Sequence, residues 1–315
     1  MKKHSFLPLL LVAPLLVGCG EVKEPKFASE GSEVDYEKFG EDFVAALNEN
    51  EFSKEDKVGS MVAKGSGKQK VTFTKSINGK EKDRLVISVE KTSNLKADTN
   101  NHVATIDERT SETMSNSDSS SSQKIAATVK TQQQIQEGTY DGKSYAFLVD
   151  KKLKTFKSAM EIPDGSTMAD TFDLAVKSAA AEYYAKIYTV GATYASASEE
   201  EKANYKFYEN NKIFTISYKK EVKDKEWTNS DLEVYKVSNE TKIEKWQIDL
   251  TNGAFAYRHY YNDVDKDEYK MNYYSSYVKG EIQETKQVVS EEIAFKSKNV
   301  KLKKVSLDKY APLGF

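Results

Sequence analysis

The sequence predicts an α+β protein in which a curved antiparallel sheet, a half-open barrel of about ten strands, packs against an N-terminal helix and a long amphipathic helix on its concave face. Three observations predict this fold. Apolar and polar residues alternate over long stretches, turn dipeptides separate those stretches, and two segments change to a helical period. No glycine-patterned βαβ unit occurs, so a parallel sheet is not expected.

Two segments have helical periodicity. The first begins after Ser32, a plausible N-cap, and has apolar residues at three- and four-residue steps: Val34, Tyr36, Phe39, Phe43, Val44 and Leu47. The second follows the break at Pro163, and Ser166 or Thr167 can cap it, with Asp170 in its first turn. Its apolar stripe predicts a long helix that ends near Gly191: Phe172, Val176, Ala179, Tyr183, Tyr184, Ile187 and Tyr188.

Strands are expected on both sides of the long helix. Asn78-Gly79, Asp141-Gly142 and Asn252-Gly253 are hairpin dipeptides between alternating segments. The polar run Ser115 to Gln123 predicts a long hairpin tip. In the second half, alternation predicts strands at 213–218, 232–237, 243–250, 254–261, 269–277 and 280–289, with a final strand at 295–305.

The N-terminus has the organisation of a secretory signal. Lys2 and Lys3 precede an apolar run from Phe6 to Val17, which at roughly 12 residues is too short to span a membrane. The run ends in Leu16-Val17-Gly18-Cys19, which resembles the lipobox of bacterial prolipoproteins. That resemblance implies cleavage before Cys19 and attachment of lipid to its thiol. We therefore expect a signal peptide at 1–18, a lipidated cysteine and flexible tether at 19–33, and a single domain at 34–315.

Composition and motifs exclude several classes of function. Basic and acidic residues number 47 and 49 and are interspersed, so no basic field would attract nucleic acid. With one cysteine the chain forms no internal disulfide. His102 and His259 have no His or Cys near them, and no common hydrolase, protease or phosphate-binding motif occurs. The sequence therefore predicts no enzyme, no catalytic residue and no cofactor.

One acidic segment imitates a calcium loop. Asp263, Asp265 and Asp267 alternate as the ligands of such a loop do. However, Glu268 stands where the loop needs glycine, and Tyr274 stands where it needs a bidentate glutamate. We therefore predict a polar hairpin tip rather than a metal site.

The element order and the Tyr140-Asp141-Gly142-Lys143 hairpin resemble the LolA/LppX-like lipoprotein-carrier half-barrels. The resemblance implies a groove between sheet and helix for acyl chains or another hydrophobic ligand. Candidate lining residues are Phe147, Phe172, Val176, Tyr183, Ile187, Trp246, Ile248, Phe255 and Tyr257. A fully packed core would use the same residues, so both interpretations stay open.

Three functions follow in order of preference. The first is a surface lipoprotein, anchored on the extracytoplasmic face of the cell membrane through Cys19, that binds or carries a lipid or other hydrophobic ligand. The second is a non-enzymatic interaction or adhesion module with an envelope protein partner. The third is an envelope hydrolase, for which the sequence offers no motif.

Overall fold

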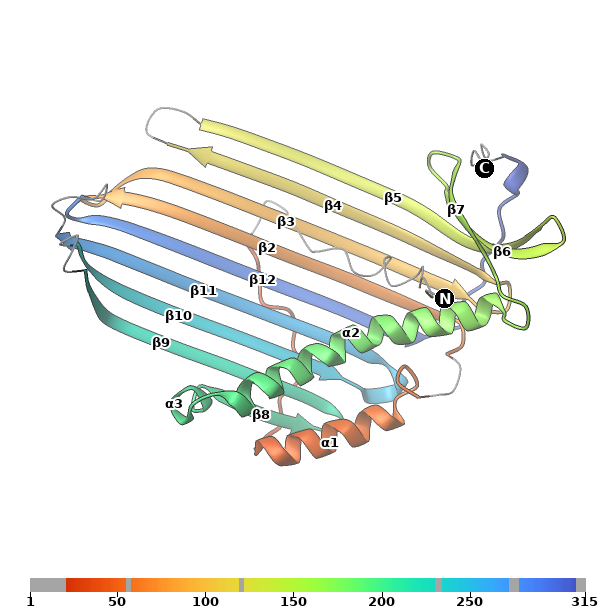
Figure 1. Cartoon of the computed structure of the whole chain (residues 1–315), viewed down its shortest axis with the longest axis horizontal. Coiled ribbons are helices and arrows are strands. Elements are labelled where there is room, and N and C mark those ends of the chain that lie inside the picture. Colours follow the sequence, from red (N-terminus) through yellow and green to blue (C-terminus); the bar gives the residue numbers. More distant parts are fainter. Residues whose placement is uncertain (1–20, 55–57, 119–121, 230–233, 272–277, 310–315) are drawn as a thin grey trace.

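The computed structural model describes residues 21–54, 58–118, 122–229, 234–271 and 278–309. Twelve strands form one antiparallel, unclosed curved sheet (Figure 1). Their bounds are β1 Ser32–Val34, β2 Met61–Ile77, β3 Lys80–Asp98, β4 Val103–Ser117, β5 Ser122–Tyr140, β6 Lys143–Asp150, β7 Thr155–Glu161, β8 Tyr205–Asn210, β9 Ile213–Asn229, β10 Val234–Asp249, β11 Phe255–Met271 and β12 Glu281–Ser297. The helices are α1 Tyr36–Glu49, α2 Met168–Ser196 and α3 Glu199–Lys202, with short 3₁₀ turns η2 Thr251–Gly253 and η3 Leu307–Lys309.

The antiparallel sheet predicted from alternation is therefore confirmed, with twelve strands rather than about ten. The order is β1-β8-β9-β10-β11-β12-β2-β3-β4-β5-β6-β7. Strands β2 to β7 and β8 to β12 are two meanders, and they meet where β2 pairs with β12 along its full length. This seam joins the two halves of the chain into one sheet.

The topology explains the length of α2. Strands β7 and β8 lie ten strand positions apart in the sheet, a distance of about 48 Å at the usual strand spacing. The 29 residues of α2 connect them and extend about 44 Å. In Figure 1 the helix crosses one face of the sheet obliquely between these two edges. Among the described residues no helix is both long and apolar enough to cross a membrane.

Thr167 caps α2 as predicted, in a reciprocal capping box with Asp170. The helix does not end at Gly191 but continues to Ser196. Gly191 instead admits the ring of Tyr36, which would lie 3.4 Å from a β-carbon at this position. The glycine is therefore a site of close helix packing rather than a helix terminus.

The predicted start of α1 is wrong. Its N-cap is Asp35, whose carboxylate accepts the Lys38 N–H at 2.7 Å, and not Ser32. Ser32–Val34 pairs instead with β8, so the helical period of Val34 yields to cross-strand pairing with Phe207.

Several strand predictions are also corrected. The strand predicted at 213–218 continues to Asn229 as β9, and the strands predicted at 232–237 and 243–250 are one strand, β10. The segments 254–261 and 269–277 were predicted as separate strands, but β11 is continuous from Phe255 to Met271, and residues 272–277 lie outside the described residues. Residues 298–305 form no strand, although a final strand was predicted at 295–305. The polar tip predicted at Ser115 to Gln123 is shorter, because β4 reaches Ser117 and β5 begins at Ser122.

Both long helices pack on the same face of the sheet. Phe43 of α1 and Tyr183 of α2 join a buried cluster with Ile248, Phe255 and Phe295 from the strands. Side chains on this face, which we call the helix face, belong to the odd residues of β2, β11 and β12 and to the even residues of β10, as the register requires.

Two irregular segments cross the opposite face, which we call the helix-free face. The N-terminal strap, residues 21–31, runs behind the strands in Figure 1 and reaches from β8, where Asn210 bonds to Ser29, to β2. The C-terminal strap, residues 298–306, crosses β3 and β5. The N-terminal strap occupies most of the segment that the sequence predicted as a flexible tether.

Each strap is held by a buried glutamine, whose side-chain amide makes the pair of hydrogen bonds that the backbone of a neighbouring strand would make. The amide of Gln247 accepts the Ala28 N–H at 2.8 Å and donates to the Ala28 carbonyl at 3.1 Å. The amide of Gln136 makes the same pair of bonds with Val305, at 2.7 and 2.9 Å. Both side chains are buried, and these bonds satisfy their amides together with bonds from Gln247 to Thr215 and from Gln134 to Gln136.

Candidate functional site

Eight of the nine residues proposed to line a lipid groove lie in the packed core. They all belong to the buried cluster between helices and sheet: Phe172, Val176, Tyr183, Ile187, Trp246, Ile248, Phe255 and Tyr257. Tyr183 and Tyr257 meet with ring centroids 5.1 Å apart, and Lys186 lies over both rings while pairing with Glu291. Burial raises the pKa of both tyrosines well above its usual value. The residues contact one another, as in a filled core.

Phe147 is on the wrong side for a groove under α2. It pairs with Gln136 in the register of β5 and β6, and both side chains point to the helix-free face. Phe147 packs against Tyr145 and Phe156, near Leu307 and Gly138. The sequence placed it with the core because the alternation of β6 alone does not say which of its faces meets the helix.

Asp263, Asp265 and Asp267 lie within β11 and not at a hairpin tip. Their side chains follow one another along the helix face, where Tyr261 donates to Asp263 and both Lys236 and Ser238 bond to Asp267. Burial, and then the charge of Asp267, raises the pKa of Asp265. No group of three or more potential metal ligands occurs within the described residues.

Cys19 and the signal segment 1–18 lie outside the described residues. The described chain begins at Glu21 on the helix-free face. Val22 is 9% exposed and lines a shallow groove of about 410 Å³ with Lys70 of β2, Tyr260 of β11 and Val288 of β12.

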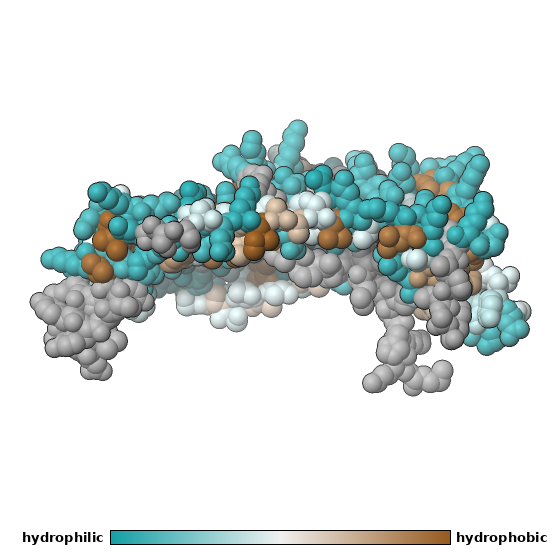
Figure 2. Space-filling view, turned by 90° about the horizontal axis from the view of Figure 1, so that it is seen from above, coloured by the Kyte–Doolittle hydropathy of each residue, from teal (hydrophilic) through white to brown (hydrophobic). Residues whose placement is uncertain are grey.

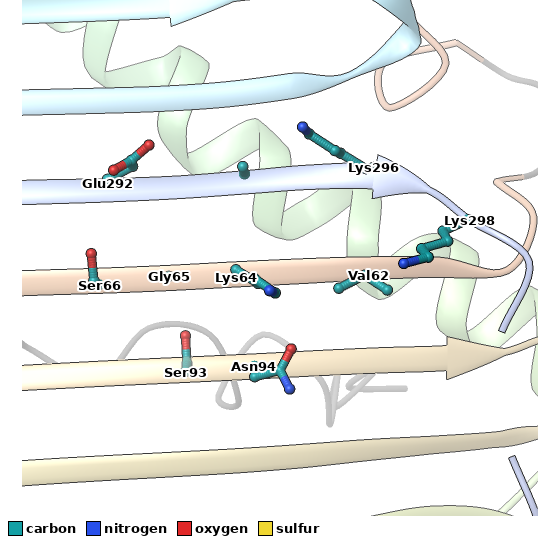
Figure 3. A pocket seen from close by; sticks show the side chains of 10 residues that line it. Val62, Lys64, Gly65, Ser66, Ser93, Asn94, Glu292, Lys296 and Lys298 are labelled. Atoms are coloured by element: carbon teal, nitrogen blue, oxygen red, sulfur yellow. The ribbon is translucent and has the colours of Figure 1, made fainter. Parts of the chain in front are cut away.

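A larger groove of about 740 Å³ lies on the same face, over β12, β2 and β3 (Figure 3). Its charged residues are Lys64, Lys296, Lys298 and Glu292, and Glu292 pairs with Arg258 at 3.3 Å. Ser66 and Asn94 add polar groups from β2 and β3. The three lysines are exposed, so the groove is basic and open to solvent.

The C-terminal strap extends this positive charge. Lys301, Lys303 and Lys304 are exposed on it, and with Lys64, Lys296 and Lys298 they form what we call the basic cluster. Asp98 fixes the strap by accepting the Leu302 N–H at 2.7 Å. Burial acts to raise the pKa of Asp98, but N–H donors from Leu302, Asn101 and Asn100 outweigh it and hold the pKa below its usual range. The sequence analysis missed this cluster because its lysines come from three segments.

A second surface is the edge of the sheet at β5. Only Gln133–Tyr140 of this strand pairs with β6, so Ser122–Gln132 has β4 on one side and no strand among the described residues on the other. Residues 122–130 are all exposed. Ile125 and Val129 are 58% and 61% exposed and point to the helix face.

Ile125 continues an apolar row across four strands. Val71, Ile87, Met114 and Ile125 are direct cross-strand partners on β2, β3, β4 and β5. The helices do not cover this end of the sheet (Figure 1). Figure 2 views the molecule from the β5 side, where hydrophobic side chains interrupt an otherwise hydrophilic edge.

The part of β9 that extends past its neighbour β8 is built differently. Beyond Tyr218, β9 extends past β8, and its residues 219–226 read KKEVKDKE. Asp224 has a left-handed φ of 51°, and the register with β10 shifts here. Charges and bulges are the usual protection of an edge strand against pairing. The apolar β5 edge has only Lys124 and Lys130 as charges along residues 122–132.

No protein-family model matches the chain, and no curated protein matches it. Among solved structures, the chain is similar to an outer membrane channel from Pseudomonas putida F1, with 8% identity over 76% of this chain and 96% of that chain and a TM-score of 0.18. A likeness at this level carries no argument about fold or function.

Proposed function

We propose that this chain is a surface lipoprotein, anchored through Cys19 on the extracytoplasmic face of the cell membrane, that acts as a non-enzymatic protein-interaction module. The partner adds an extended strand to the β5 edge. The observation that carries the proposal is the segment Ser122–Thr131, which pairs with β4 on one side and with no strand of the described residues on the other, and which exposes the side chains of Ile125 and Val129. The apolar row behind it would receive the partner's apolar side chains.

The hydrophobic-ligand function stays a prediction. An unclosed curved sheet with both helices on one face supports the LolA/LppX-like resemblance. The contacts among Tyr183, Tyr257 and Phe295 leave the predicted groove residues bound to one another, which favours the interaction module. Native mass spectrometry of residues 20–315 separates the two, because an apolar molecule bound to the purified protein would revive the carrier function.

The anchor is tested by Cys19→Ala in the full chain. We expect the parent protein in the membrane fraction, labelled by a clickable fatty acid, and the variant unlabelled and lost from that fraction. Two or three acyl chains supply the binding, since each buried methylene contributes about 0.8 kcal/mol. A Cys19→Ala variant that remained membrane-bound after a high-salt wash would refute the lipid anchor.

The interaction is tested with Ile125→Lys/Val129→Lys. A photo-crosslinker at Thr128, on the exposed strand, should capture a partner on intact cells, and the double variant should reduce capture about tenfold or more, because lysines on an edge oppose pairing and remove apolar contact area. Both side chains are largely exposed, so the melting temperature should hardly change.

The matched control is Leu174→Lys on α2, where an equally exposed apolar residue lies away from the edge. Undiminished capture in the double variant would refute the β5 edge as the binding surface. If the crosslinker captures a second copy of this chain and native mass spectrometry shows a dimer, the β5 edge binds another copy of the protein rather than a different partner.

A further inference from the structure

We infer that the helix-free face lies against the membrane, with the basic cluster in contact with the anionic phosphate headgroups of the lipid bilayer. This orientation rests on the proposed anchor at Cys19 for its biological setting. The affinity of the face for anionic lipid follows from the described residues alone.

The first argument is the position at which the described chain begins. Glu21 and Val22 lie against the helix-free face, beside Lys70. Glu21 is two positions after Cys19, a distance of at most about 7 Å along an extended chain. A lipid on Cys19 therefore enters the bilayer from this face. The N-terminal strap cannot swing away freely, because Gln247 holds Ala28 by two hydrogen bonds.

The second argument is the charge on that face. The six lysines of the basic cluster are exposed. Three carboxylates of the described residues lie beside them: Glu292, which pairs with Arg258, Asp98, which accepts the Leu302 N–H, and Glu137, 3.9 Å from Lys304 and shared with His102. Six lysines outnumber these carboxylates, so the cluster holds a net positive charge. Exposed lysines are attracted to anionic lipid by about 1 kcal/mol each, or about fivefold in partition coefficient.

The third argument is that the anchor and the basic cluster would hold the same face against the membrane at two separate places. Lys64 and Lys70 lie six residues apart on β2, about 20 Å. Glu21, near Lys70, and the basic cluster, near Lys64, are thus two separate places on one face. One lipid-modified residue alone leaves a domain free to tilt, whereas a second attachment on the same face fixes it.

This orientation has consequences for the other surfaces. In this orientation the helix face points away from the bilayer. The carboxylates of Asp263, Asp265 and Asp267 lie on that face, so they stay away from anionic lipid, which would repel them. The β5 edge then lies sideways, parallel to the membrane, where it is open to a neighbouring envelope protein.

The first test uses residues 20–315 without acyl chains, since residues 21–309 contain the whole sheet and its core. Vesicles of phosphatidylglycerol and phosphatidylcholine should sediment this protein, and vesicles of phosphatidylcholine alone should not. Lys296→Gln/Lys298→Gln/Lys301→Gln should reduce the partition coefficient at least about tenfold. Rising salt should weaken binding of the parent protein.

The control is Lys38→Gln/Lys186→Gln/Lys202→Gln, which makes the same change of net charge on α1, α2 and α3. Equal loss in both variants, or equal binding to the two kinds of vesicle, would overturn the inference, because only net charge or a non-electrostatic contact would then be involved.

The second test uses the lipidated full chain with one new cysteine for a fluorophore. Acylation blocks Cys19, so Ser66→Cys reports the helix-free face and Ala195→Cys reports α2. We expect headgroup-attached quenchers to act on the label at 66 and hardly on that at 195, and the reverse would overturn the orientation. If Cys19 itself reacts with the fluorophore, its thiol carries no lipid and the anchor is absent. The vesicle experiment with the acyl-free protein then still decides whether the helix-free face binds anionic lipid.

Discussion

Replacing Phe295 by alanine is expected to destabilise the protein by about 3–5 kcal/mol, the usual cost of deleting a buried aromatic ring. Phe295 is fully buried at the β12 end of the seam between the two meanders. Its ring lies 5.7 Å from that of Phe255, 5.9 Å from that of Phe52 and 6.4 Å from that of Tyr183, measured between centroids. The substitution leaves a cavity between α2, β11 and the turn that follows α1.

Chemical denaturation of Phe295→Ala and of Leu174→Ala measures this effect. Leu174 is 63% exposed, so its substitution should change the free energy of unfolding by less than about 0.5 kcal/mol. A loss below about 1 kcal/mol for Phe295→Ala would mean that the region between helix and sheet is not filled. The hydrophobic-ligand function would then regain its groove.

Gln247→Ala is expected to cost about 2–3 kcal/mol and to release the N-terminal strap. Gln247 is completely buried and bonds to both backbone groups of Ala28 and to Thr215. Alanine leaves the Ala28 N–H and carbonyl without these partners, and each unsatisfied buried polar group costs about 1–3 kcal/mol. Limited trypsin digestion should then cleave after Lys23 or Lys26 much faster than in the parent protein.

Gln136→Ala is the matched control, because Gln136 holds Val305 of the C-terminal strap in the same way. It should speed trypsin cleavage after Lys303 and Lys304, because the backbone of the C-terminal strap is released, while leaving the N-terminal strap protected. If each variant made both straps sensitive to trypsin, the two glutamines would contribute to global stability rather than each holding its own strap.

Several elements follow from local physical chemistry and were predictable. Asn78-Gly79 is a two-residue turn with φ of 51° and 74°, which needs residues that tolerate the left-handed region. The Thr167 capping box and the apolar stripe of α2 are also local, and the structure has both. The cap of α1 was misplaced because Val34 satisfies a helix period and a strand period equally well, and pairing with Phe207 decides between them.

The sequence by itself determined the alternation that makes a sheet, the turns that fold it into meanders, and the one helix long enough to connect its opposite edges. These depend on neighbours within a few residues. The tertiary structure alone decided that β12 pairs with β2, that the predicted groove residues pack against one another, and that Phe147 faces away from α2. It also brought the basic cluster together from β2, β12 and the C-terminal strap. The physical reason is that alternation along a strand shows only that its two faces differ. Which face the helices and the straps cover depends on the packing of segments that are distant in the sequence.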